Sequence, residues 1–166
     1  MKSNTILVAL LLFIGLTTAP ITIHADTSAQ AFQINDTNVM FLIDFQMTAD
    51  KSDQSVPIIA SSRVAYNDRV DVVGYSLKSS DTTTPSISAV SGFVLSTATI
   101  ALNNRYIIKA STTESFRLAI FATFEKPMTS HVAATITKLP YWINDRRTTV
   151  HQNQLADLDT ATLIAQ

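Results

Sequence analysis

Apolar residues recur at every second position along most of this chain. Because successive side chains of a β-strand point to opposite faces, such alternation predicts a strand with one buried face. In residues 39–48 the predicted buried face consists of Val39, Phe41, Ile43, Phe45 and Met47.

Six more stretches show the same alternation: 58–65, 70–78, 92–102, 105–110, 115–125 and 132–139. In 115–125 both faces are largely apolar, because Ala119 and Phe121 lie opposite the row from Phe116 to Phe124. We therefore predict that this stretch is a central strand.

Turn residues separate these stretches. Asn67-Asp68, Asn103-Asn104 and Asn144-Asp145 stand between apolar runs, and Asn and Asp tolerate the positive φ of tight turns. Asn103-Asn104 is the clearest two-residue hairpin. The loop 79–86 (SSDTTTPS) is expected to carry the chain from one sheet to the other.

Short strands at such spacing, without helical periodicity, indicate an all-β fold. We predict a single β-sandwich of about seven strands over residues 32–143, Ig-like or jelly-roll-like in its pattern. Residues 144–166 form a predicted C-terminal tail. Within it, 153–166 has leucines on a loosely helical spacing and is either a frayed tail or an added edge strand.

The N-terminus has the order of a signal peptide: Lys2, an apolar run over 6–16 and a more polar stretch ending at Ala25. We predict a signal peptide over 1–25 and a flexible lead-in over 26–31, so that the domain is secreted or held at the cell surface. Cleavage after Ala31 and an uncleaved anchor are the alternatives. The apolar run is shorter than the about 20 residues of a membrane-spanning helix, so no stable span is expected after cleavage.

Composition removes several classes of function. The chain has no cysteine, which excludes cysteine-ligated zinc or iron–sulfur sites and lipid attachment at a cysteine. Its net charge is −1 and its densest basic cluster is the pair Arg146-Arg147, so no nucleic-acid partner is expected.

Chemistry-bearing residues are sparse. His131 and His151 are the histidines outside the leader, too few for a histidine metal site, and no Gly-x-Ser-x-Gly motif occurs. We therefore predict no catalytic residue, no cofactor and no metal ligand. The spacings Asp50/Asp53 and Asp157/Asp159 could contribute to a calcium site, but turn and solvating roles are favoured because calcium needs six to eight oxygens.

Asp44 interrupts a very apolar strand. An inward carboxylate would be costly, so we expect it to face solvent or to pair with an arginine of a neighbouring strand. Pro140-Tyr141-Trp142 is the candidate ligand site, since flat aromatic faces bind sugars and peptides. The alternative is that Tyr141 and Trp142 close one end of the core.

These observations favour an exported, non-catalytic module that acts by binding or assembly. Its partner would be an extracellular protein or a glycan, and it could associate with itself through sheet edges. One alternative is a small secreted hydrolase with dispersed residues, in which His131 or His151 meets a carboxylate and a serine. Another is an exported inhibitor or ligand-binding protein with Tyr141 and Trp142 exposed together.

Overall fold

The computed structural model describes residues 22–63, 70–79, 86–101, 103–128, 131–155, 158 and 160–163, with only the backbone described for 24–28. Within these residues the chain is all-β apart from one 3-10 turn, η1 (Gln152–Gln154). The strands are β1 (Thr22–Gln33), β2 (Asn38–Thr48), β3 (Gln54–Pro57), β4 (Ile59–Ser61), β5 (Val73–Ser79), β6 (Ile87–Ser96), β7 (Thr99–Ala101), β8 (Arg105–Ile108), β9 (Thr113–Phe124), β10 (Val132–Ile143), β11 (Arg146–His151) and β12 (Ala161–Leu163).

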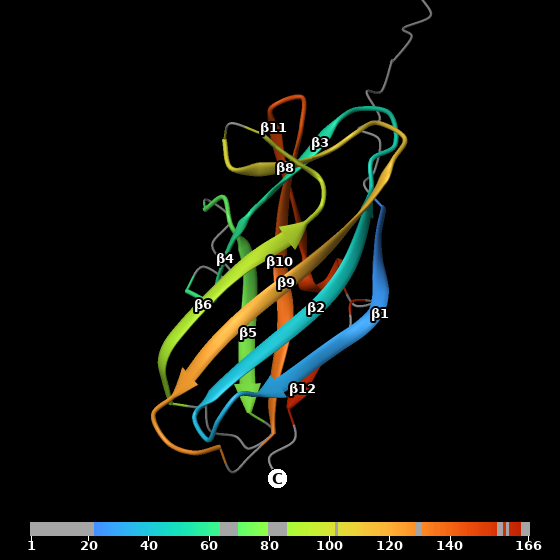
Figure 1. The fold of residues 1–166 in the computed structure, drawn as a ribbon. Coiled ribbons are helices and arrows are strands. Elements are labelled where there is room, and N and C mark those ends of the chain that lie inside the picture. Colours follow the sequence, from blue (N-terminus) through green and yellow to red (C-terminus); the bar gives the residue numbers. More distant parts are fainter. Residues whose placement is uncertain are drawn as a thin grey trace, which may run out of the picture.

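The strands form two layers (Figure 1). The front layer has the order β1-β2-β9-β6, and the back layer has the order β5-β10-β3-β8-β7, with β11 and β12 also paired to β10. Short β4 pairs with β6 on one side and β5 on the other, so one hydrogen-bonded path joins the layers. The prediction of an all-β sandwich is confirmed, and β9 is central in its layer as predicted.

The structure has more strands than the predicted seven. Strands β1 and β11 are rich in polar residues, and β3 and β12 are very short, so none shows the apolar alternation on which the prediction depended. The predicted strand 92–102 is divided between β6 and β7.

Both ends of the predicted domain extend further than the sequence indicated. Residues 26–31, expected to be a flexible lead-in, lie within β1, which begins at Thr22 and pairs with β2. Cleavage after Ala25 would therefore remove the first residues of this strand. Processing itself stays a prediction, because residues 1–21 lie outside the described residues.

The predicted tail belongs to the back layer. Strands β11 and β12 both pair with β10, so the described part of the tail is an addition to the sheet. Leu155, Leu158 and Leu163 are all buried. The loosely helical spacing of these leucines is thus explained by packing on the core and not by a regular helix.

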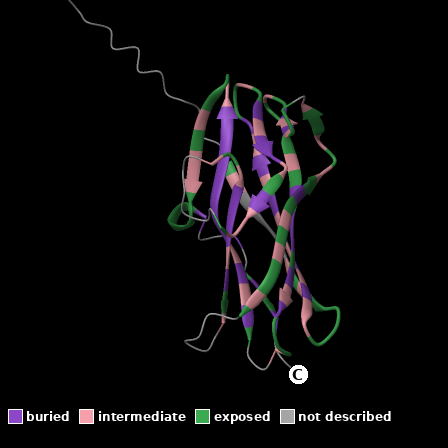
Figure 2. Ribbon diagram, turned by 90° about the vertical axis from the view of Figure 1, so that its left-hand side faces the viewer, coloured by how far each residue is buried: buried purple, intermediate pink, exposed green. Residues whose placement is uncertain are grey.

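The core lies between the two layers, where Figure 2 shows the buried residues concentrated. The predicted inner face of β2, from Val39 to Met47, is at most 1% exposed, and the predicted inner face of β9 is buried as well. Gly92 lies opposite Tyr75 of the other layer. A Cβ at Gly92 would lie 2.6 Å from Cε1 of Tyr75, so the absence of a side chain lets the tyrosine ring reach the front layer.

The predicted turn at Asn144-Asp145 is confirmed: these residues have φ 46° and 62° and connect the paired ends Ile143 and Arg146 of β10 and β11. Asn103-Asn104 also lies in a turn, and Asn104 has φ 56°, but the paired ends of β7 and β8 are Ala101 and Arg105, so this connection is a three-residue loop and not the predicted two-residue hairpin. Asn67-Asp68 lies outside the described residues. The loop 79–86 is described only at its ends, but the strands on either side of it, β5 and β6, belong to different layers as expected.

Candidate binding surfaces

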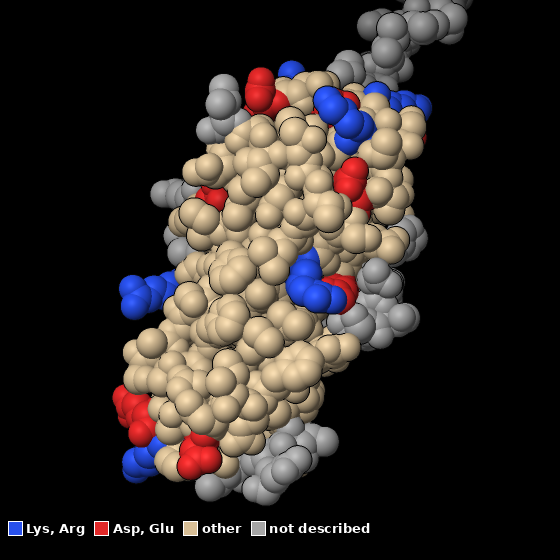
Figure 3. Space-filling view, viewed as in Figure 1, with Lys and Arg blue, Asp and Glu red and all other residues tan. Residues whose placement is uncertain are grey.

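The outer side of the front layer carries an unusual number of exposed apolar side chains. We call it the front face and define it by the outward side chains of four strands: Phe32 (β1), Met40, Leu42 and Asp44 (β2), Arg117, Ala119 and Phe121 (β9), and Phe93 and Leu95 (β6). Figure 3 shows this side as mostly uncharged, with one pair of opposite charges within it and the other charged side chains towards its ends. Ile59 of β4, paired with Phe93, continues it at 56% exposure.

The alternation of β9 explains this surface. Leu118 and Ile120 point into the core, so Ala119 and Phe121 have to point outward. Phe121 is 37% exposed and stacks on Phe93, which is 36% exposed, with ring centroids 5.9 Å apart. The front face is therefore an aromatic surface supported by a rigid sheet.

One ion pair lies within the front face. Arg117 donates from Nε to Oδ1 of Asp44 at 2.6 Å and from Nη2 to Oδ2 at 2.7 Å, across the β2–β9 ladder. The hydrogen bonds to Asp44 raise the pKa of Arg117. The predicted pairing of Asp44 with an arginine of a neighbouring strand is confirmed. A hollow of about 430 Å³ adjoins the pair, lined also by Leu95 and Phe116.

The predicted aromatic site on β10 differs from its expected geometry. Tyr141 and Trp142 are each only 6% exposed, so they do not form an open platform. As consecutive strand residues they point to opposite faces: Tyr141 packs in the core, and Trp142 lies on the outer side of the back layer. Burial raises the pKa of Tyr141, partly offset by a hydrogen bond with Thr148.

A cation covers Trp142. The guanidinium carbon of Arg105 lies 3.3 Å from the centroid of the indole ring. Asp71 holds this cover in place, because it contacts Arg105 at 3.6 Å and Arg147 at 2.8 Å. No pattern in the sequence indicates this cover, because Arg105 belongs to β8 and is distant in the chain from Trp142.

A hollow of about 240 Å³ reaches the edge of Trp142. Its lining includes Asn103, Asp145 and Gln54, which is almost fully buried and whose Oε1 accepts no hydrogen bond. Amide and carboxylate groups beside an indole could hold a small polar ligand. Ligand binding at Tyr141 and Trp142 stays a prediction.

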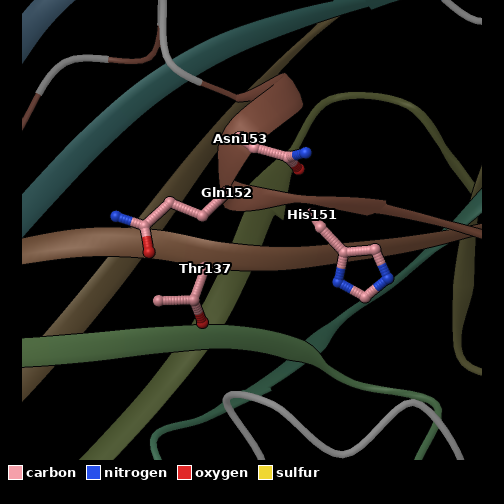
Figure 4. A pocket seen from close by; sticks show the side chains of 4 residues that line it. All are labelled: Thr137, His151, Gln152 and Asn153. Carbon is pink, nitrogen blue, oxygen red and sulfur yellow. The ribbon is translucent and has the colours of Figure 1, made fainter.

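The two histidines are not brought together. His131 is exposed just before β10, and His151 is exposed at the end of β11. Figure 4 shows His151 beside Thr137, Gln152 and Asn153, which with it line a hollow of about 440 Å³. Of the described residues that line this hollow, none is a serine or a carboxylate. The arrangement that the hydrolase hypothesis requires is therefore not found there.

The acidic pairs have ordinary structural partners where they are described. Asp53 accepts hydrogen bonds from Lys109 Nζ at 2.8 Å and from the backbone N–H of Ala110 at 3.0 Å, and the bond from Lys109 contributes most to its lowered pKa. Asp157 and Asp159 lie outside the described residues. Within the described part of the chain, no group of three or more His, Cys, Asp or Glu residues could hold a metal ion. The same part contains no helix with the length and apolarity to cross a membrane.

The similarity of this chain to known proteins is weak. No protein-family model matches the sequence, and no curated protein does. Among solved structures, the GAE domain of yeast GGA1 is similar with a TM-score of 0.34 and 8% identity, over 86% of this chain and 90% of that one. The GAE domain of GGA2p from Saccharomyces cerevisiae has a TM-score of 0.33 and 11% identity, over 88% and 91%. At these TM-scores, neither similarity indicates the fold or the function of this chain.

Proposed function

We propose that this chain is an exported, non-catalytic binding module that docks a protein partner through the front face. The observation that carries the proposal is the cluster of exposed apolar side chains in the middle of a sheet, above all Phe93, Leu95 and Phe121. Burying such surface gains about 25 cal/mol per Å², and contiguous apolar patches mark interaction sites.

The layout of the front face supports a protein partner. Interfaces between proteins are depleted of charged residues and enriched in aromatic residues at their centre, and Figure 3 shows this side as mostly uncharged apart from one ion pair within it. Phe93 and Phe121 lie on the broad surface of the sheet, outside the hollow beside Asp44 and Arg117, and such a surface suits another protein better than a small molecule, which needs a concave site. Export rests on the N-terminal sequence pattern alone, and an enzyme or an inhibitor has no comparable observation in its favour.

Site-specific crosslinking in the producing cells tests the docking surface. A photoreactive amino acid replaces Phe93 in one full-length chain and Ile100 in a matched control, because Ile100 is also large, apolar and exposed (57%) but lies on β7. We expect a discrete adduct from position 93 alone, which disappears when Phe121→Ser is added. The absence of any discrete adduct, or equal adducts from both positions, contradicts the proposal.

Export is tested separately. N-terminal sequencing of the secreted chain is expected to begin at Asp26, immediately after the predicted cleavage point. A full-length chain that stays in the cytosol would contradict the exported part of the proposal.

A further inference from the structure

We infer that the partner on the front face is a second copy of this chain, related by a two-fold axis that runs along the boundary between β2 and β9. This inference rests on the proposed function, because it names the occupant of the same surface.

The front layer is symmetric in strand number about that boundary. Its order β1-β2-β9-β6 places two strands on either side. A two-fold axis in the plane of contact exchanges the sides, so that β9 of each copy lies over β2 of the other and β6 lies over β1. Such isologous contacts, in which one surface meets itself, are the commonest way in which identical chains associate.

The register of β2 and β9 makes the surface complementary to itself. Across the boundary Asp44 lies beside Arg117, Leu42 beside Ala119 and Met40 beside Phe121. The axis turns each of these neighbours into a contact between copies. In the dimer, a carboxylate therefore meets a guanidinium.

The two apolar pairs of neighbours, Leu42 with Ala119 and Met40 with Phe121, also fit each other between the two copies. The small side chain of Ala119 meets the large Leu42 of the second copy, and Phe121 meets Met40, whose sulfur packs well against aromatic rings. Ala119 is only 2% exposed, so Leu42 of the second copy packs over it and against the larger side chains that surround it. Large residues of one copy therefore lie opposite small or adaptable residues of the other.

The area is sufficient for a stable dimer. Four strands spaced about 4.8 Å apart, along the 12 residues of β9 at about 3.3 Å each, cover roughly 750 Å² per copy. A standard interface between two proteins buries about 800 Å² per partner. The whole front layer, and not only its apolar centre, is then the contact surface.

Charge reversal gives a test that a different partner could not mimic. In Asp44→Arg, arginine at position 44 of each copy would meet Arg117 of the other, and in Arg117→Asp two aspartates would meet. We expect each variant alone to self-associate at least about tenfold more weakly than the unaltered chain in sedimentation velocity, because opposed like charges are costly. An equimolar mixture is expected to form heterodimers, since each copy then meets the opposite charge.

The double variant Asp44→Arg with Arg117→Asp is the matched control, because it restores both the internal and the intermolecular pair and is expected to dimerise. Circular dichroism checks that the single variants fold, because each of them places two like charges side by side on β2 and β9. An unaltered chain that stays monomeric at high concentration, or a mixture no more associated than its components, overturns the inference. In that case an adduct of another mass from position 93 would still support the proposed function, whereas no adduct would contradict both.

Discussion

The front face and the outer side of the back layer both carry outward aromatic residues, but only the front face leaves them accessible. Trp142 on the back layer is 6% exposed beneath Arg105, whereas Phe93 and Phe121 on the front layer are 36% and 37% exposed. Strands β8 and β11 supply cations beside Trp142, and Asp71 fixes them there. On the front face the guanidinium of Arg117 is instead held by Asp44. An aromatic residue is thus available for docking where the chain does not cover it with its own side chains.

The largest effect is expected from substituting neighbours on opposite faces of β9. Ile120→Ala removes a fully buried side chain and should lower the free energy of unfolding by about 2–5 kcal/mol. Phe121→Ala loses mainly a ring contact on the surface and should cost about 0.5–1 kcal/mol. Urea denaturation of both variants measures the difference. If both variants lost the same free energy of unfolding, Phe121 would contribute to stability as a core residue does. It would then not be a side chain left accessible for docking.

A second test concerns the contact between the layers. Gly92→Ala places a methyl group against the ring of Tyr75 and should destabilise the domain by about 1–3 kcal/mol. Ser91→Ala is the control, because Ser91 is exposed on the same strand and should change stability little. Thermal unfolding of both variants decides; a neutral Gly92→Ala would show that Tyr75 has room to move.

Removing the cover of Trp142 should make the back layer resemble the front face. Arg105→Ala loses a cation–π contact worth about 0.5–2 kcal/mol and exposes the indole ring. Trp142 is the only tryptophan, so its fluorescence emission should shift to longer wavelength. Lys109→Ala, which removes a cation of the Asp53 ion pair, should leave the emission unchanged. Identical spectra from the two variants would contradict the role of Arg105 as a cover.

The smallest expected effect is on the pH dependence of folding stability, through the ionisation of two tyrosines of the back layer. Burial raises the pKa of both Tyr75 and Tyr141 above the ordinary value of 10.0. The neutral forms are favoured in the folded state, so this stability is fully present below the unfolded pKa and is lost as pH rises through the higher folded pKa. The double variant Tyr75→Phe and Tyr141→Phe should lose less stability between about pH 9 and 12 than the unaltered chain. Parallel curves in chemical denaturation across that range would rule this out.

The alternation of apolar and polar residues predicted which side chains of a strand face the core. It did not predict contacts between residues that are distant in the chain. Alternation within β2 and β9 sufficed to place Phe41 and Ile120 inside and Asp44 outside, because it depends only on strand geometry. The cover of Trp142 by Arg105 depends on the pairing of distant strands, which one sequence does not reveal. The polar strands β1 and β11 were not predicted, because they lack apolar alternation. Backbone pairing with β2 and β10 is what holds them in the extended conformation.

One feature of the front face is visible in the sequence. The two apolar faces of 115–125 predict a central strand, and β9 does lie inside its layer. In a two-layer sandwich, however, even a central strand has one side turned away from the core. Apolar residues such as Phe121 on that side are therefore exposed, which is the observation on which the proposed docking surface rests.

The pairing of β2 with β9 also determines when the domain can fold during synthesis. Asp44 and Arg117, which meet across this ladder, are separated by 73 positions in the chain. Closing so long a loop is slow and must come before the ladder can stabilise it. A ribosome must therefore make the chain as far as β9, which is most of the polypeptide, before the front layer can form.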